Sequence, residues 1–304
     1  MSNPLRIATR GSALALWQAN YVAEQLRAVV PGRPVELVTI QTQGDREQTR
    51  PLAQIGGEGL FTKAIQDAVR ERAADVAVHS LKDLPTIPVS ELALAAVPPR
   101  GPTGDAFLSR KFGRFDDLPV GARLATGSTR RRAMVLNRRP DLKLVEIRGN
   151  VDTRLRKLAD LDLDGLILAQ AGLVRLNLGH AITEVLDATW MLPAVGQGAL
   201  GLECRVDDAE TRRVLAMLDD LPSRQAATAE RSLLLALGGG CQIPVGASAA
   251  VNEDGLQLRG TVLSPDGKQR INGAITGLAH RAEDLGKDLA RIMLEKGSRT
   301  LLGM

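Results

Sequence analysis

Aromatic residues and cysteine are both scarce in this chain of 304 residues. Four Phe, two Trp and one Tyr make up 2% of the sequence, too few for a single-strand nucleic-acid binder, which stacks bases on aromatic side chains. Two cysteines cannot build a disulfide framework. No run approaches the roughly 20 apolar residues of a membrane span, and the N-terminus lacks the apolar stretch of a secretion signal. We therefore expect a cytoplasmic globular protein of two or three domains.

Histidine is also rare. His79, His180 and His280 are scattered along the chain, and neither cysteine has a neighbour at zinc-ligand spacing, so no metal site is expected. The sequence contains no nucleophile elbow, Walker loop or dinucleotide fingerprint. The motifs of common hydrolases, nucleotide-binding proteins and zinc enzymes are therefore missing.

Arginine, in contrast, is abundant and concentrated. Residues 100–157 hold 12 Arg and 3 Lys against 6 acidic residues, a net charge of +9, which leaves the rest of the chain at −5. Codon bias explains a high arginine total but not its concentration in one segment, and a solvated basic face remains an alternative. Because guanidinium groups grip carboxylates and phosphates through paired hydrogen bonds, the segment favours a small polycarboxylate or phosphate ligand over nucleic acid.

Strand-like and helical runs alternate through the first two hundred residues, which indicates an α/β fold. We expect strands at 5–10, 35–42, 75–80, 93–97, 123–126, 143–147, 165–169 and 200–204, and helices at 12–30, 61–72, 129–139 and 151–161. Breaker clusters at 98–104 and 192–198 predict two lobes around a cleft. Three alternating runs at 245–251, 256–263 and 269–277, with helices at 224–237 and 281–295, predict a small α+β domain with an antiparallel sheet.

Polar residues end the strand-like segment 75–85, where Lys82 and Asp83 stand just before Pro85. In α/β sheets the carboxyl ends of strands face the ligand crevice. A carboxylate there stabilises a developing positive charge or relays a proton. A solvated turn before the proline is the plain alternative for a single Lys-Asp pair, and the segment alone does not decide between the two.

Arginine also stands beside three expected strand-to-helix junctions, at residues 8–12, 126–132 and 147–154. Unpaired N–H groups and the positive end of the helix dipole favour anions at such junctions. Ser12, Ser128 or Thr129, and Asn150 are good helix caps, but capping does not account for the arginine beside each of them. Together the junctions indicate several carboxylates or phosphates.

Cys241 follows the consecutive glycines 238–240. A structural cysteine normally packs among branched apolar residues, whereas glycines leave room and permit unusual backbone angles. This context suits a covalent attachment point on a loop. A passive residue in a tight turn after a helix is the alternative. Cys204 lies within a strand-like run, and we expect it to be structural.

In order and spacing, these segments closely resemble the porphobilinogen deaminase (hydroxymethylbilane synthase) family over nearly the whole chain. The resemblance is carried by residues 8–12, 44–45, 56–61, 78–83, 126–131, 147–151, 192–198 and 239–242. It implies two α/β lobes like those of periplasmic binding proteins, formed by residues 1–99 with 200–217 and by residues 104–193. A third domain of α+β structure, with the antiparallel sheet and the cysteine, would span residues 222–304.

The resemblance also implies a transferase of tetrapyrrole and haem biosynthesis. It would carry a dipyrromethane cofactor on Cys241 through a thioether, deaminate four porphobilinogen molecules, join them head to tail and release hydroxymethylbilane. The implied protein is a cytoplasmic monomer whose partner is this small-molecule substrate, without nucleic acid or membrane.

By the family's pattern, Asp83 is the catalytic residue, because its carboxylate would face the pyrrole N–H and stabilise the cation left when ammonia departs. The implied cofactor-binding residues are Cys241, Lys82, Asp83, Ser128, Arg130 and Arg131. The implied substrate-binding residues are Arg10, Ser12, Arg148, Arg154 and Arg175. Each pyrrole bears an acetate and a propionate, and guanidinium groups are natural counter-charges for both.

Four positions depart from this pattern. Gly127 stands where a second serine is common, Gly238 where glutamate often precedes the glycines, and Gln54 and Glu58 occupy an expected lid in which lysines are frequent. Two rival functions stay open: an anion-binding receptor of the same two-lobe architecture and a basic nucleic-acid-binding protein. The missing secretion signal and the third domain weigh against the receptor. The shortage of aromatics and the lack of binding motifs weigh against the second.

Overall fold

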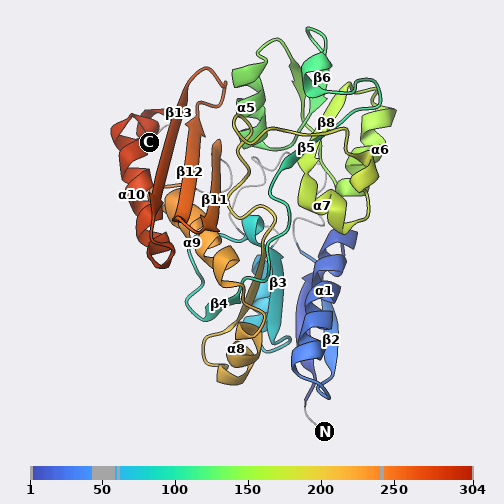
Figure 1. Ribbon diagram of the computed structural model, residues 1–304. Helices are drawn as coiled ribbons and strands as arrows, with labels where there is room; N and C mark the ends of the chain where they lie inside the picture. Colours follow the sequence, from blue (N-terminus) through green and yellow to red (C-terminus); the bar gives the residue numbers. More distant parts are fainter. Residues whose placement is uncertain (1–2, 43–58, 60–61, 240–242, 303–304) are drawn as a thin grey trace. The chain divides into compact units, whose positions relative to one another are not determined.

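The computed structural model describes residues 3–42, 59, 62–239 and 243–302. The chain forms two compact units, Met1–Gly101 with Ala199–Arg224 and Pro102–Gly198 with Gln225–Met304. Figure 1 shows the elements of each unit. No helix within the described ranges is long and apolar enough to cross a membrane.

A five-stranded sheet with the order β2-β1-β3-β10-β4 builds the first unit. Its parallel strands are β1 (Leu5–Arg10), β2 (Val35–Ile40) and β3 (Val76–Ser80). Strand β10 (Leu200–Arg205) runs antiparallel between β3 and β4 (Leu92–Ala96). Thus a strand that follows the second α/β segment in the sequence completes the first sheet.

Helices cover both faces of this sheet. Along β3, Val76 and Val78 pack with α1 (Ala13–Val29) and α8 (Ala209–Ala216), whereas Ala77 packs on the opposite face with α4 (Lys63–Arg70). This alternation follows from the two-residue period of a strand. Both faces of β3 are therefore buried, and a cavity lies at its carboxyl end.

A second five-stranded sheet, with the order β7-β6-β8-β5-β9, belongs to the second unit. Strand β6 (Arg123–Ala125) pairs in parallel with β7 (Lys143–Val145) and β8 (Gly165–Ala169). Strand β5 (Asp105–Leu108) is antiparallel to β8 and to β9 (Glu184–Val185). Helices α5 (Thr129–Arg138), α6 (Val151–Asp160) and α7 (Gln170–Arg175) follow β6, β7 and β8.

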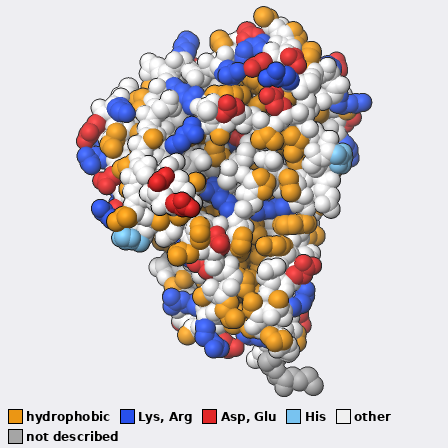
Figure 2. Space-filling model, viewed as in Figure 1, with side chains coloured by type: hydrophobic (Ala, Val, Ile, Leu, Met, Phe, Trp, Pro, Cys, Tyr) orange, Lys and Arg blue, Asp and Glu red, His pale blue; other side chains and the backbone are white. Residues whose placement is uncertain are grey.

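The C-terminal part of the second unit is a three-stranded antiparallel sheet of β11 (Val245–Asn252), β12 (Gly255–Leu263) and β13 (Arg270–Gly277). It packs against α9 (Leu221–Ala236) and α10 (Ala282–Glu295). A methyl group at Gly260 would come within 2.8 Å of Leu233 on α9, so the bare backbone lets helix and sheet approach closely. Charges of both signs dot the surface over α10 (Figure 2), where Lys287 pairs with Glu283.

The predicted fold class is confirmed: two α/β lobes and a small antiparallel α+β domain are present. Every expected helix and strand exists, with ends that shift by a few residues. The sequence patterns did not predict strands β5 and β9, helices α7, α8 and α11 (Ser298–Leu301), or the short 3-10 helices η1 (Leu81–Asp83), η2 (Phe115–Asp117), η3 (Gly179–Ala181) and η4 (Ala279–Arg281). The missed elements are short, and short segments carry too few residues to display a period.

Candidate functional site

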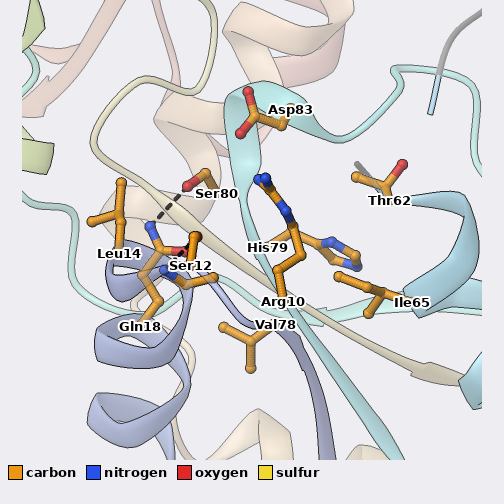
Figure 3. Close-up of a pocket in the computed structure, with 11 residues that line it drawn as sticks. Arg10, Ser12, Leu14, Gln18, Thr62, Ile65, Val78, His79, Ser80 and Asp83 are labelled. Atoms are coloured by element: carbon orange, nitrogen blue, oxygen red, sulfur yellow. Dashed lines mark hydrogen bonds between the residues drawn. The ribbon is translucent and has the colours of Figure 1, made fainter. Parts of the chain in front are cut away.

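A cavity lies at the carboxyl end of the first sheet, where the parallel strands β1 and β3 end side by side. Figure 3 shows the side chains around it. Three residues expected from the sequence meet here: Arg10, Ser12 and Asp83. Other lining residues are Leu14, Ala15, Gln18, Thr62, Ile65, Val78, His79 and Ser80.

Asp83 ends the single turn η1, which follows β3 directly. The turn is fixed by Leu81, which is fully buried and donates its N–H to the carbonyl of Ala199 over 3.0 Å. A methyl group at Gly201 would come within 2.9 Å of the Leu81 side chain, so this glycine makes room for the leucine. Lys82 lies half-buried in the same turn but is not among the lining residues. Buried contacts of the turn thus orient the carboxylate.

Ser12 is the N-cap of α1, and its hydroxyl accepts the N–H of Ala15 over 3.4 Å. The capping alternative raised by the sequence is therefore present, yet Ser12 and Arg10 also line the cavity. The first turn of this 17-residue helix directs N–H groups toward the same end of the sheet. Both observations agree with an anion at this junction.

Gln18 and Ser80 were not predicted as site residues. The side-chain amide of Gln18 donates to the hydroxyl of Ser80 over 2.8 Å, and Gln18 is buried. Because the Ser80 oxygen accepts this bond through a lone pair, its own O–H can still donate a hydrogen bond. A glutamine on the apolar face of α1 is the sequence signal that could have indicated this pair.

In the second unit, Arg130 and Arg131 of α5 are buried together with Asp105 of β5. Arg130 Nη1 lies 2.7 Å from one carboxylate oxygen of Asp105, and Arg131 donates from Nε and Nη2 to the other at 3.0 and 2.7 Å. Gln197 adds a bond of 3.0 Å to the second oxygen. One carboxylate therefore serves two guanidinium groups, and the cluster keeps a net positive charge.

The charges set the protonation of this cluster. Burial alone would raise the pKa of Asp105, but the charges of Arg130 and Arg131 outweigh it and hold that pKa well below its usual range. Burial lowers the pKa of Arg130, although Asp105 opposes that shift. A carboxylate ligand would add the missing negative charge.

Ser128 caps α5, since its hydroxyl accepts the N–H of Arg131 over 3.4 Å. Asn150 holds the same position before α6 but makes no side-chain capping bond. The two junctions lie together: a Cβ at Gly127 would come 2.6 Å from the carbonyl oxygen of Ile147. Strand pairing brings the arginine-bearing ends of β6 and β7 to one edge of the sheet.

Arg148 leads into the second of these junctions, where two side chains hold the main chain of Arg148 and Gly149. Arg154 Nε donates to the Gly149 carbonyl over 2.7 Å, and Lys157 donates to the Arg148 carbonyl over 3.1 Å. Nη1 of Arg148 is buried with no hydrogen-bond partner within the described residues. Arg175 ends α7 and donates to the Gly198 carbonyl over 2.7 Å.

Cys241, Gln54 and Glu58 lie outside the described residues. Cys204 is buried in β10, where burial raises the pKa of its thiol to about 11. Among the described residues, no group of three or more His, Cys, Asp or Glu side chains is placed to hold a metal ion.

Two family descriptions match the sequence. "Porphobilinogen deaminase, dipyromethane cofactor binding domain" matches residues 5–213, and "Porphobilinogen deaminase, C-terminal domain" matches residues 224–295. Proteins named porphobilinogen deaminase are similar over almost their whole length. The one from Trichlorobacter lovleyi is 48% identical over 98% of this chain and 95% of its own. The one from Syntrophotalea carbinolica is 46% identical over 99% and 96%.

Solved structures of other kinds are also similar. A periplasmic substrate-binding protein of an ABC transporter from Coxiella burnetii gives a TM-score of 0.45 at 15% identity, over 75% of this chain and 96% of its own. A putative methionine-binding lipoprotein from Bacillus subtilis gives 0.44 at 12% identity, over 71% and 89%.

The Asp105 cluster predicts a large and pH-dependent loss of stability in Asp105→Asn. Removing the only negative charge leaves two buried guanidinium groups unpaired, which costs about 3–5 kcal/mol of unfolding free energy at neutral pH. Because the folded-state pKa is depressed, this stabilisation is complete above the unfolded pKa, about 4, and is lost as the pH falls toward the folded pKa. Denaturant unfolding between pH 7 and pH 3 should show the gap to wild type narrowing below about pH 4.

Asp116→Asn is the control, since Asp116 pairs with Arg138 on the surface and exposed pairs contribute little. An Asp105→Asn protein as stable as this control would contradict the assignment.

The close contact at Gly127 predicts that Gly127→Ser also lowers the stability of the protein. Its Cβ would lie 2.6 Å from the Ile147 carbonyl oxygen, so the two junctions must separate, at about 1–3 kcal/mol. The matched control is Gly179→Ser, where no atom lies within 4 Å of the new Cβ. Urea midpoints measure both, and equal midpoints would show that the junctions do not approach so closely.

Proposed function

The chain belongs to the porphobilinogen deaminase family, and we propose that Asp83 supplies its catalytic carboxylate and that Cys241 carries its dipyrromethane cofactor. Membership makes the chain a transferase of tetrapyrrole biosynthesis, which joins porphobilinogen units into hydroxymethylbilane. One observation carries the proposal for the site: Asp83, Arg10 and Ser12 line a single cavity.

The chemistry of this cavity suits the reaction. Loss of ammonia from porphobilinogen leaves a positive charge spread over the pyrrole and its exocyclic methylene. A carboxylate near the ring N–H stabilises this cation, and it can accept the proton released when the new C–C bond forms. Arg10 and the N–H groups that open α1 offer donors for an acetate or propionate arm.

The second unit suits a cofactor with several carboxylates. Arg130 and Arg131 share one aspartate, and Arg148 holds a buried N–H group without a partner among the described residues. A carboxylate arm would satisfy this donor, since buried polar groups are normally hydrogen-bonded. When bound, the dipyrromethane supplies the ring carbon to which the first substrate is joined. Lys82, Ser128, Arg154 and Arg175 complete the proposed contacts.

The domain boundaries 1–99 with 200–217, 104–193 and 222–304 stay part of the proposal, as do the monomeric state and the cytoplasmic location. The first family region ends at residue 213 and the second begins at residue 224. This boundary supports a third domain that begins near residue 222. A reducing compartment suits an enzyme whose cofactor attaches to a free thiol.

The first test replaces the proposed catalytic carboxylate. Asp83→Asn keeps the shape of the side chain and removes its charge, so turnover should fall by roughly two to four decades. The rate of hydroxymethylbilane formation from porphobilinogen measures this loss, and intact mass confirms that the cofactor is still attached. Asp67→Asn is the matched control, since Asp67 lies on α4 and pairs with Arg70 near the surface. Near-normal turnover of Asp83→Asn would refute the role of Asp83.

The second test concerns the thioether. Intact-protein mass spectrometry should find wild type heavier than its sequence by two substrate-derived pyrrole units, and Cys241→Ser without that addition, because a serine hydroxyl is a far poorer nucleophile than a thiolate. Cys204→Ser should keep the added mass, since the buried Cys204 thiol has a pKa of about 11. Added mass on Cys241→Ser would place the attachment elsewhere, and an unmodified wild type after incubation with porphobilinogen would favour an anion-binding receptor.

A further inference from the structure

Three buried polar side chains lie together on the α4 face of the first sheet, and the reaction as proposed uses none of them. His79 Nε2 of β3 is 3.0 Å from Oε2 of Glu203 on β10. The side-chain amide of Gln66 on α4 donates to the same oxygen over 2.9 Å. All three are buried. The cluster ties two neighbouring strands to the helix that covers them.

Stability does not explain this cluster. Ile65, Ala68 and Ala77 form an apolar core on the same face of the sheet, and hydrophobic residues often replace a buried charged group and its partners without loss of stability. A buried carboxylate is tolerated only with good partners. The cluster is therefore best explained by what it holds in place.

The position of His79 connects the cluster to the site. His79 is the fourth residue of β3, Ser80 is the last, and η1 with Asp83 follows at once. The imidazole also lines the cavity that Asp83 and Arg10 line (Figure 3). In the strand register His79 lies opposite Gly201, and Glu203 opposite Ala77, so the carboxylate reaches the ring diagonally across the two strands.

We propose that Glu203 is a positioning residue: it holds His79 with the proton on Nε2, and His79 in turn fixes the end of β3 that carries Asp83. This inference rests on the proposed role of Asp83. The Nε2 atom lies 3.0 Å from Glu203 Oε2, although its N–H is not aligned for a hydrogen bond. The carboxylate therefore acts on the ring mainly through its charge, and a neutral isostere removes that hold.

Glu203→Gln tests the proposal, because it keeps the shape of the side chain and removes the charge. We expect kcat for hydroxymethylbilane formation to fall roughly tenfold to a hundredfold, as a small misplacement of a catalytic group does, with KM nearly unchanged. His79→Ala should lose a similar factor. His79→Gln should recover most of kcat, because its amide nitrogen reaches about the position of Nε2.

Histidine nitrogen NMR gives a readout that does not depend on activity. The chain has only three histidines, so the His79 signals are assigned by comparison with His79→Gln. We expect wild type to show a proton on Nε2. In Glu203→Gln the amide oxygen takes the place of the oxygen that accepts from Gln66, so the proton should stay on Nε2 while kcat falls.

Cys204→Ala is the control for a merely structural effect, since Cys204 is the next residue on β10 and faces the opposite core. It should lower the melting temperature and leave kcat intact. The proposal is overturned if Glu203→Gln behaves in the same way, or if wild type carries the His79 proton on Nδ1 instead of Nε2. Normal turnover in Asp83→Asn would instead refute the role of Asp83 and leave the tautomer result standing.

Discussion

One buried carboxylate, that of Asp105, allows the second unit to hold two guanidinium groups in its interior. Arg130 and Arg131 approach it at 2.7 Å each. Nη1 of Arg130 also donates to the carbonyl of Leu192, and Nη1 of Arg131 donates to that of Ile167. Without Asp105 the pair would repel and lose its hydration at once. With Asp105, the buried cluster is stable and keeps a net positive charge. A protein can then hold buried positive charge for an anionic ligand before that ligand binds.

Much of the fold follows from patterns visible in the sequence. The runs that became β1, β3, β8 and α1 are long or strongly apolar, so their period identifies them. Strand β5 escaped notice because it has four residues and begins with an aspartate, a residue disfavoured in strands. Its aspartate is tolerated there only because Arg130 and Arg131, distant in sequence, neutralise it. Local propensity does not contain that information.

The residues of the site also fall into those that the sequence predicted and those that only the tertiary structure reveals. Arg10, Ser12 and Asp83 were predictable, because strand ends and helix starts carry them to one edge of a parallel sheet. Gln18 was not singled out, since its partner Ser80 lies 62 residues away and only folding joins them. From the sequence, Arg130 and Arg131 were expected to bind an anionic ligand. It did not reveal that an internal aspartate already holds both, because that pairing depends on the tertiary contact of β5 with α5.

Strand β3 shows how a fold can fix a carboxylate, here the proposed catalytic group Asp83, that stands beyond its last hydrogen-bonded residue. Backbone pairing alone leaves the end of a strand free to fray. Here successive side chains point to opposite faces: Ser80 bonds to Gln18 on the α1 side, and His79 contacts Glu203 on the α4 side. Leu81 then locks the following turn to the backbone of Ala199. Polar contacts on both faces, followed at once by a buried leucine, leave the Asp83 backbone little freedom. Such preorganisation is what the proposed role of Asp83, electrostatic stabilisation of a short-lived cation, requires.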